Sequence, residues 1–142
     1  MARKNQEYRQ KTIKPWGWEI LFTPSGLAYV GKILFIRAGQ RLSLQIHSQK
    51  QETLCLIKGK AFLILENKDG KLIRLPMKLK TGYTVKHGQK HRLEAEVDSL
   101  IAEASTPEIG KTYRLEDDYN RKDENLNNFS TSTLAIDKKS PK

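Results

Sequence analysis

The sequence contains little cysteine and no long hydrophobic run. Its 142 residues include one cysteine, Cys55, so an internal disulfide cannot form. No stretch of about 18 apolar residues is present to span a bilayer. Residues 1–7 carry charges but lack the apolar segment of a secretory signal. These absences exclude a disulfide scaffold and a membrane-spanning protein, and they predict a soluble, cytoplasmic protein with no membrane partner.

Basic residues outnumber acidic ones, but they do not form a continuous stripe. Lysine and arginine total 26 against 16 aspartate and glutamate residues, which gives a formal net charge of +10. Five of the basic residues lie within positions 1–14, and the others are interspersed with acids. A nucleic-acid-binding surface needs basic residues gathered on one face. We therefore expect no nucleic-acid partner, whereas the positive field would attract an anionic small substrate such as a sugar phosphate.

Short apolar or alternating runs, cut by glycine, proline and Asp-Gly signals, fill residues 16–116. This pattern has no helical period and is typical of β-strands. It predicts an all-β sandwich or barrel of one domain, because the length suits a single core. The expected strands are 18–22, 29–36, 41–47, 53–57, 61–66, 71–75, 82–85, 91–95 and 99–105.

The chain ends differ in composition from its middle. Residues 1–13 are predicted to form a basic N-terminal arm, and residues 14–121 the domain. Residues 122–142 are rich in Asn, Ser, Thr and Lys and poor in apolar residues, so we expect a disordered tail there.

Residues 39–47 have the most informative pattern, because the side chains of a strand alternate between its two faces. The apolar side chains on one face are Leu42, Leu44 and Ile46. The polar side chains on the other face are Arg41, Ser43, Gln45 and His47.

Two further metal-ligand candidates follow this strand. Glu52 opens the next expected strand five residues after His47, so a short turn can return its carboxylate to the imidazole. His91 opens another strand after a glycine turn. Amide, imidazole and carboxylate donors suit divalent Zn, Mn, Fe, Co or Ni. The residues alone leave two interpretations open, a metal site or a polar strand face exposed to solvent.

The spacing of these residues resembles the first cupin motif. Its positions are occupied by Gly39, Gln45, His47, Glu52 and Gly59, with Gln45 in place of the usual first histidine. Residues 86–91 resemble the second cupin motif, although a lysine replaces its proline. Segments 14–19, 39–45, 91–94 and 115–121 resemble the carboxy-terminal cupin domain of type II mannose-6-phosphate isomerases.

The resemblance implies a cupin double-stranded β-helix, a jelly-roll barrel, with a divalent metal bound by Gln45, His47, Glu52 and His91. Zinc is the first candidate, and Mn, Fe, Co and Ni are alternatives. The implied activity is a metal-dependent aldose–ketose interconversion of the mannose 6-phosphate and fructose 6-phosphate type. The family also implies a homodimer, for which the apolar face of residues 42, 44 and 46 would be suitable.

Three residues are candidates for catalysis or substrate binding. Arg41 and Lys50 could bind substrate oxygens or phosphate, and Lys50 could take part in proton transfer. Glu94 matches a family position and could act as a base, although alternation from His91 points it out of the barrel. Trp16 and Trp18 match a family motif and are expected on one face, closing the barrel.

The pocket rim departs from the family pattern, because histidine, arginine and tryptophan positions are changed. The replacing residues are Ser48, Gln49, Lys50, Thr53 and Leu54. This departure keeps two alternatives open. The chain could be a cupin epimerase or another small-molecule enzyme acting on sugars, or a non-catalytic carbohydrate-binding cupin.

Overall fold

The computed structural model describes residues 6–107, 109–122 and 124–125. Within these residues all regular elements are β-strands, so the all-β prediction is confirmed. The strands are β1 (Gln10–Lys14), β2 (Gly17–Leu21), β3 (Val30–Ile36), β4 (Leu44–His47), β5 (Glu52–Lys58), β6 (Ala61–Glu66), β7 (Leu72–Pro76), β8 (Gly82–Val85), β9 (His91–Ala95), β10 (Ser99–Ser105), β11 (Lys111–Glu116) and β12 (Glu124–Asn125).

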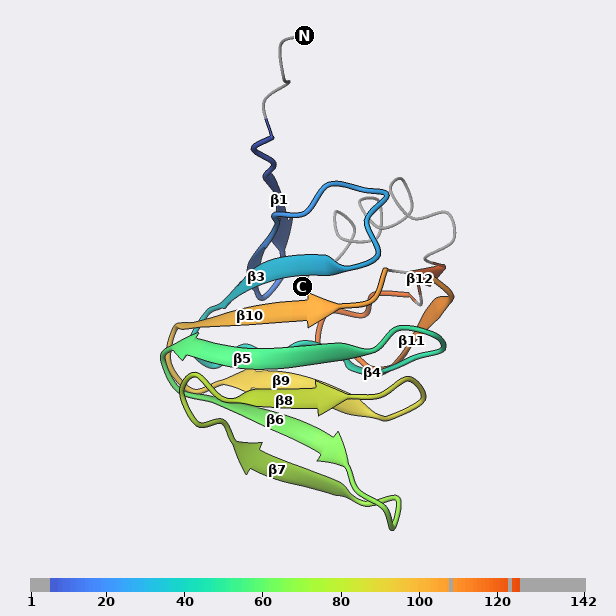
Figure 1. Cartoon of the computed structure of the whole chain (residues 1–142). Coiled ribbons are helices and arrows are strands. Elements are labelled where there is room, and N and C mark those ends of the chain that lie inside the picture. The colour runs from blue at the N-terminus through green and yellow to red at the C-terminus, as the bar shows by residue number, and fades with distance from the viewer. Residues whose placement is uncertain (1–5, 108, 123, 126–142) are drawn as a thin grey trace, which may run out of the picture.

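The strands form two six-stranded sheets whose ladders are antiparallel. One sheet has the order β1-β2-β3-β10-β5-β8 and the other β12-β11-β4-β9-β6-β7. Figure 1 shows β3, β10 and β5 side by side, with β6 and β7 of the second sheet at the bottom of the view. Because successive strands often belong to opposite sheets, the chain closes into a jelly-roll barrel.

Alternation along the strands places apolar side chains between the two sheets. Ile36 and Ile101 from one sheet and Leu63 from the other are fully buried. Their neighbours in the core include Leu34, Leu54, Leu56, Leu93 and Ala95. Burial of these side chains holds the sheets together, since each fully buried aliphatic side chain contributes about 1.5–3 kcal/mol.

Two glycines allow close packing at turns. A Cβ atom at Gly17 would lie 1.9 Å from the carbonyl oxygen of Phe35, so the pairing of β2 with β3 requires glycine there. Gly59 joins β5 to β6 with φ +106°, and a Cβ atom there would lie 2.5 Å from the carbonyl oxygen of Asp98. The turn expected at residues 58–60 therefore needs glycine both for its conformation and for space.

Several strand boundaries match the prediction, and the polar strands β1, β11 and β12 were missed. The strands β6, β8, β9 and β10 have the predicted bounds. The strand predicted at 41–47 begins later, at Leu44. Neither β1, with the sequence QKTIK, nor β11, with the sequence KTYRLE, was predicted, because both contain mainly polar residues.

The expected ends of the domain also change. Residues 10–13 were assigned to the arm, but they belong to β1, which pairs along its length with β2. At the other end, Glu124–Asn125 pairs with β11 as β12. The disordered tail was predicted for residues 122–142, of which 123 and 126–142 lie outside the described residues.

The two tryptophans do not share a face, contrary to the prediction. Trp16 lies in the turn between β1 and β2 and is 3% exposed within the core, whereas Trp18 stacks on Phe35 with ring centroids 5.3 Å apart. Alternation applies within a strand and does not extend into the turn that precedes it. Trp16 therefore closes the barrel, and Trp18 covers a different face of β2.

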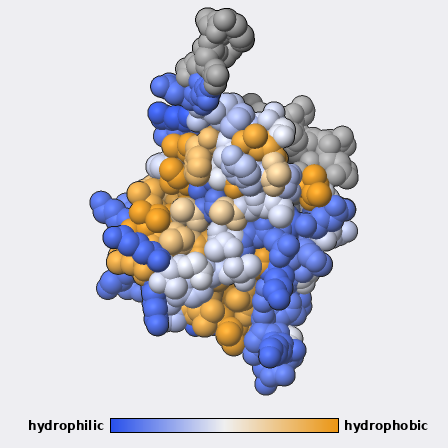
Figure 2. Space-filling view, viewed as in Figure 1, coloured by the Kyte–Doolittle hydropathy of each residue, from blue (hydrophilic) through white to orange (hydrophobic). Residues whose placement is uncertain are grey.

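The apolar face expected to pair two copies is not an exposed face. Leu44 is 7% exposed, and Leu42 packs against the core. The large exposed apolar side chains are instead dispersed over β1, β5, β7, β11 and several loops, and Figure 2 shows apolar and hydrophilic residues interspersed on the visible face. The homodimer stays a prediction, without this face to support it. No helix among the described residues is long and apolar enough to cross a membrane.

Candidate metal centre

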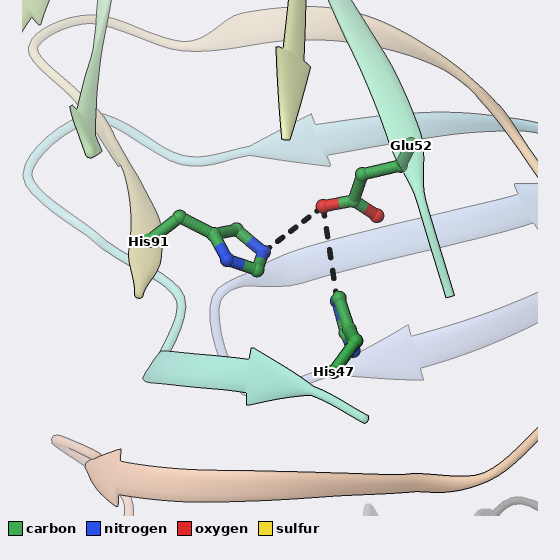
Figure 3. A group of neighbouring side chains, drawn as sticks. All are labelled: His47, Glu52 and His91. Atoms are coloured by element: carbon green, nitrogen blue, oxygen red, sulfur yellow. Dashed lines mark ion pairs between the residues drawn. The ribbon is translucent and has the colours of Figure 1, made fainter. Parts of the chain in front are cut away.

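Three predicted metal ligands meet inside the barrel. His47 ends β4, Glu52 begins β5 and His91 begins β9, so the strands of both sheets bring them together. Their exposed fractions are 6%, 6% and 3%. The Oε2 atom of Glu52 lies 3.0 Å from Nε2 of His91 and 3.8 Å from Nε2 of His47 (Figure 3). One carboxylate oxygen therefore faces both imidazoles.

The other ring nitrogen of each histidine is held by a neighbour. Nδ1 of His91 lies 3.0 Å from the carbonyl oxygen of Gln89, which can only accept, so Nδ1 carries the hydrogen. Nδ1 of His47 lies 2.9 Å from Oγ1 of Thr112. Contacts of this kind fix the orientation of metal-binding imidazoles and leave Nε2 for the metal.

This donor set fits a divalent metal. Because Nδ1 carries the hydrogen, a neutral His91 ring would present its Nε2 lone pair to a carboxylate oxygen at 3.0 Å. Two acceptors at this distance repel each other unless a proton or a metal ion lies between them. One donor atom from each of the three residues lies within 4.8 Å of the others. The triad can therefore bind a metal ion through two nitrogens and one oxygen.

The protonation states of the triad also suit metal binding. Burial opposes ionisation of Glu52, but the charge of Lys50 and the two facing histidines outweigh it and hold the pKa of Glu52 well below its usual value. Burial lowers the pKa of His47, although the facing Glu52 carboxylate opposes this effect. A carboxylate and a neutral imidazole are the forms that bind metals.

Lys50 was predicted at the pocket rim and lies inside, 5% exposed. Its Nζ atom is 3.3 Å from Oε1 of Glu52 and 3.0 Å from Oε2 of Glu103. The two oxygens of Glu52 thus have separate partners, Lys50 on one side and the histidines on the other. This ion pair orients the carboxylate toward the imidazoles.

The triad forms part of the wall of a cavity of about 90 Å³. Gln45, the fourth predicted ligand, lines the same cavity and pairs with His91 across β4 and β9. The charged residues that line it are Lys14, Glu19, Lys32, Lys50, Glu52, Arg92, Glu103, Arg114 and Arg121. Such a cavity presents to a ligand both a triad that can bind a metal and more basic than acidic groups.

Two of the predicted catalytic residues lie away from this cavity. Arg41 forms a bidentate pair with Asp118, at 2.8 and 3.0 Å, and its side chain is 39% exposed. Glu94 pairs with Arg74 at 2.9 Å on the outer side of β9, as strand alternation predicted. The sequence interpretation placed Arg41 inside the barrel because a strand was expected to begin at residue 41. Arg41 instead precedes β4, so the alternation of that strand does not apply to it.

The family model described as mannose-6-phosphate isomerase C-terminal matches residues 1–124. The chain belongs to this family. The prediction made from the spacing of the cupin motifs is therefore confirmed. None of the curated protein sequences matches this family member.

Solved structures confirm the cupin jelly-roll fold. The capsular polysaccharide assembling protein CapF from Staphylococcus aureus matches with a TM-score of 0.67 and 15% identity, covering 77% of this chain and 32% of CapF. Oxalate decarboxylase from Bacillus subtilis matches with a TM-score of 0.67 and 13% identity, covering 81% of this chain and 33% of the decarboxylase. The chain spans about a third of each protein. At these identities the likeness concerns the fold alone.

The segment 115–121, which resembles the end of the family's domain, contributes one residue to the cavity wall. Arg121 lines it and is held by Asp117 through two side-chain contacts of 3.1 Å. Asp118 instead holds Arg41 on the outside, and the Tyr119 hydroxyl donates to Gln40. The segment therefore serves both the cavity wall and the barrel exterior.

The sequence interpretation missed several cavity residues of this cupin. Lys32 and Glu103 sit in otherwise apolar stretches of β3 and β10, on the same faces as the buried Leu34 and Ile101. The sequence feature that could have identified them is a charged residue on the same strand face as apolar residues. Because charge is costly to bury, such a position indicates a partner or a ligand.

Stability of the metal-free protein should fall as the pH is lowered below about 6.5 and again below about 4.5. The folded-state pKa of His47 lies under its ordinary 6.5, and that of Glu52 lies well under its ordinary 4.5. In both windows the unfolded chain binds more protons than the folded one, so acidification favours unfolding.

Urea unfolding with a chelator at a series of pH values measures this dependence. The variant His47→Gln should lose the upper step, and the exposed His87→Gln should retain it. A free energy of unfolding that stays flat across the upper window in the parent would contradict the assignment.

Proposed function

We propose that this cupin is a metal-dependent sugar-phosphate isomerase that interconverts an aldose and a ketose, of the mannose 6-phosphate and fructose 6-phosphate type. The observation that carries the proposal is the buried triad of His47, Glu52 and His91 in the wall of a cavity with excess basic groups. Membership of the mannose-6-phosphate isomerase C-terminal family supports the same activity.

The metal would be held by His47, Glu52 and His91, with Gln45 as a fourth ligand from the same cavity wall. Zinc is the first candidate for two nitrogens and a carboxylate, and Mn, Fe, Co and Ni suit the same donors. When bound, the cation supplies Lewis-acid polarisation of the sugar oxygens and stabilises negative charge that develops on them.

The cavity charge favours a phosphorylated sugar over a neutral one. Six basic and three acidic side chains line it. Two of the basic groups have acidic partners outside the lining, since Arg121 pairs with Asp117 and Arg92 with Glu116. The lining thus holds more basic than acidic side chains, and a bound divalent cation would add further positive charge. A phosphate group suits such a lining, because buried charge is stabilised by pairing.

The test is isomerisation by protein loaded separately with Zn, Mn, Fe(II), Co or Ni. We expect metal-dependent interconversion of mannose 6-phosphate and fructose 6-phosphate, and a kcat/KM at least about 100-fold lower for unphosphorylated mannose, a loss of roughly 3 kcal/mol of transition-state binding. A chelator should abolish the activity and added metal should restore it.

Stoichiometric metal without turnover of either sugar phosphate would contradict the proposed reaction. That outcome would favour one of the two alternatives, another sugar enzyme of the cupin class or a carbohydrate-binding cupin. Absence of bound metal under all five conditions would contradict the site itself.

A further inference from the structure

A second carboxylate lies beside the triad without belonging to it. Glu103 is on β10, which pairs directly with β5, and it is 6% exposed. Its register partner is Leu54, two residues from Glu52 on the same face of β5. The Cβ atoms of such diagonal neighbours are about 7 Å apart, so both carboxylates reach the same part of the cavity.

Lys50 connects the two carboxylates. Its Nζ atom is 3.0 Å from Oε2 of Glu103 and 3.3 Å from Oε1 of Glu52. All three side chains are more than nine-tenths buried, and all three line the cavity. The ammonium group therefore holds Glu103 in place next to the triad, within the space that a substrate bound there would occupy.

We propose that Glu103 is the catalytic base that carries the proton between C1 and C2 of the sugar. This inference depends on the proposed isomerase function and names a residue for it. In the first step the C2–H bond of the open-chain aldose breaks and its proton goes to the Glu103 carboxylate. The electron pair of that bond forms the C1=C2 double bond, and the carbonyl π pair moves onto O1.

The second half of the reaction returns the proton. The O2 hydroxyl proton moves to O1, and the Glu103 carboxylic acid gives its proton to C1. The C1=C2 pair forms the new C1–H bond, while O2 becomes the carbonyl oxygen of the ketose. Atoms and electrons balance without an oxidant or a reductant.

The other cavity acids are less suited to this role. Glu52 is one of the three triad residues, and Glu19 pairs with Lys32 at 3.3 Å in another part of the cavity wall. Glu19 lies on β2, three strands from β5 in the order β2-β3-β10-β5, which corresponds to about 14 Å at the usual strand spacing. Glu103 is one strand away from β5. Its position therefore matches a base acting on a sugar held at the triad.

The variant Glu103→Gln tests the proposal in the metal-loaded protein. We expect full metal content and a Kd for mannose 6-phosphate within about 3-fold of the parent, measured by calorimetry. Cleavage of the C2–deuterium bond of C2-deuterated mannose 6-phosphate, followed by NMR, should fall by about 10²- to 10⁴-fold, as for loss of a general base. Glu96→Gln, an exposed position after β9, is the matched control and should equal the parent.

The variant Glu103→Asp keeps a carboxylate and the pairing with Lys50, and it should retain bond cleavage at a rate between those of the parent and Glu103→Gln. Parental cleavage in Glu103→Gln overturns the assignment and leaves the proposed function intact. A folded, metal-loaded aspartate variant as inactive as the glutamine variant also overturns it. Absence of cleavage in the parent overturns both the base and the isomerase.

Discussion

Replacing Glu52 with glutamine should lower metal affinity by about 100-fold or more. The substitution keeps the size of the side chain but removes the negative charge that faces both imidazoles. Loss of a contact that only orients a ligand costs about 10- to 100-fold in metal affinity, so loss of a ligand's charge should cost at least as much. Competition with a chromophoric chelator measures the affinity, and elemental analysis measures the stoichiometry.

The same variant should lose the stabilisation that metal provides. At a free metal concentration of 100 times the parental Kd, the parent gains about 2.7 kcal/mol of unfolding free energy, and a variant with 100-fold weaker binding gains about 0.4 kcal/mol. The control Glu96→Gln should behave as the parent, because that side chain is exposed. Stoichiometric metal bound to Glu52→Gln with parental affinity would show that the triad is not the metal site.

Replacing Lys50 with methionine should destabilise the protein by roughly 3–5 kcal/mol near neutral pH, because it leaves buried carboxylates without this cationic partner. Lys50 is 5% exposed and contacts both Glu52 and Glu103. Methionine approximates the length of the lysine stem, so the effect reports charge more than volume. Urea unfolding of the metal-free protein measures the change.

The pH dependence separates this effect from a packing defect. Lys50 is the largest of the influences that lower the pKa of Glu52, so its loss leaves burial to raise that pKa. The carboxylate can then take up a proton in the folded variant, and the stability deficit relative to the parent should shrink as the pH is lowered. Lys58→Met, at an exposed position at the end of β5, should change stability by less than about 0.5 kcal/mol. A deficit in Lys50→Met that is independent of pH would contradict the electrostatic explanation.

The strands that sequence predicted well are those with apolar alternation and clear turn residues at both ends. The strand β6, with the sequence AFLILE, is of this kind, and its bounds agree with the prediction. The strand β1 is built from polar residues and is fixed by pairing with β2 through all five of its residues. Because this strand is stabilised by pairing with a partner, its own polar sequence does not predict it.

The grouping of His47, Glu52 and His91 could be predicted because their spacing resembles the cupin motifs, whose ligands lie at the starts and ends of strands. The charges around the triad could not be predicted in the same way. Lys50 lies in the turn after β4, where strand alternation does not indicate which way its side chain points. Arg41 was assigned to the interior by extending a strand three residues too far, and β4 begins at Leu44. Glu103 lies on β10, whose bounds were predicted, and only its pairing with β5 brings it near Glu52.

The placement of the triad on both sheets has a mechanical consequence. Glu52 belongs to the sheet that contains β5, whereas His47 and His91 belong to the opposite sheet, where β4 and β9 share a single register pair. A metal held by all three would therefore cross-link the two sheets, and it would do so where the pairing of β4 with β9 is weak. A chain with one cysteine has no covalent means of doing this. Removing the metal with a chelator would then act on this barrel as a reducing agent acts on a disulfide-bonded one.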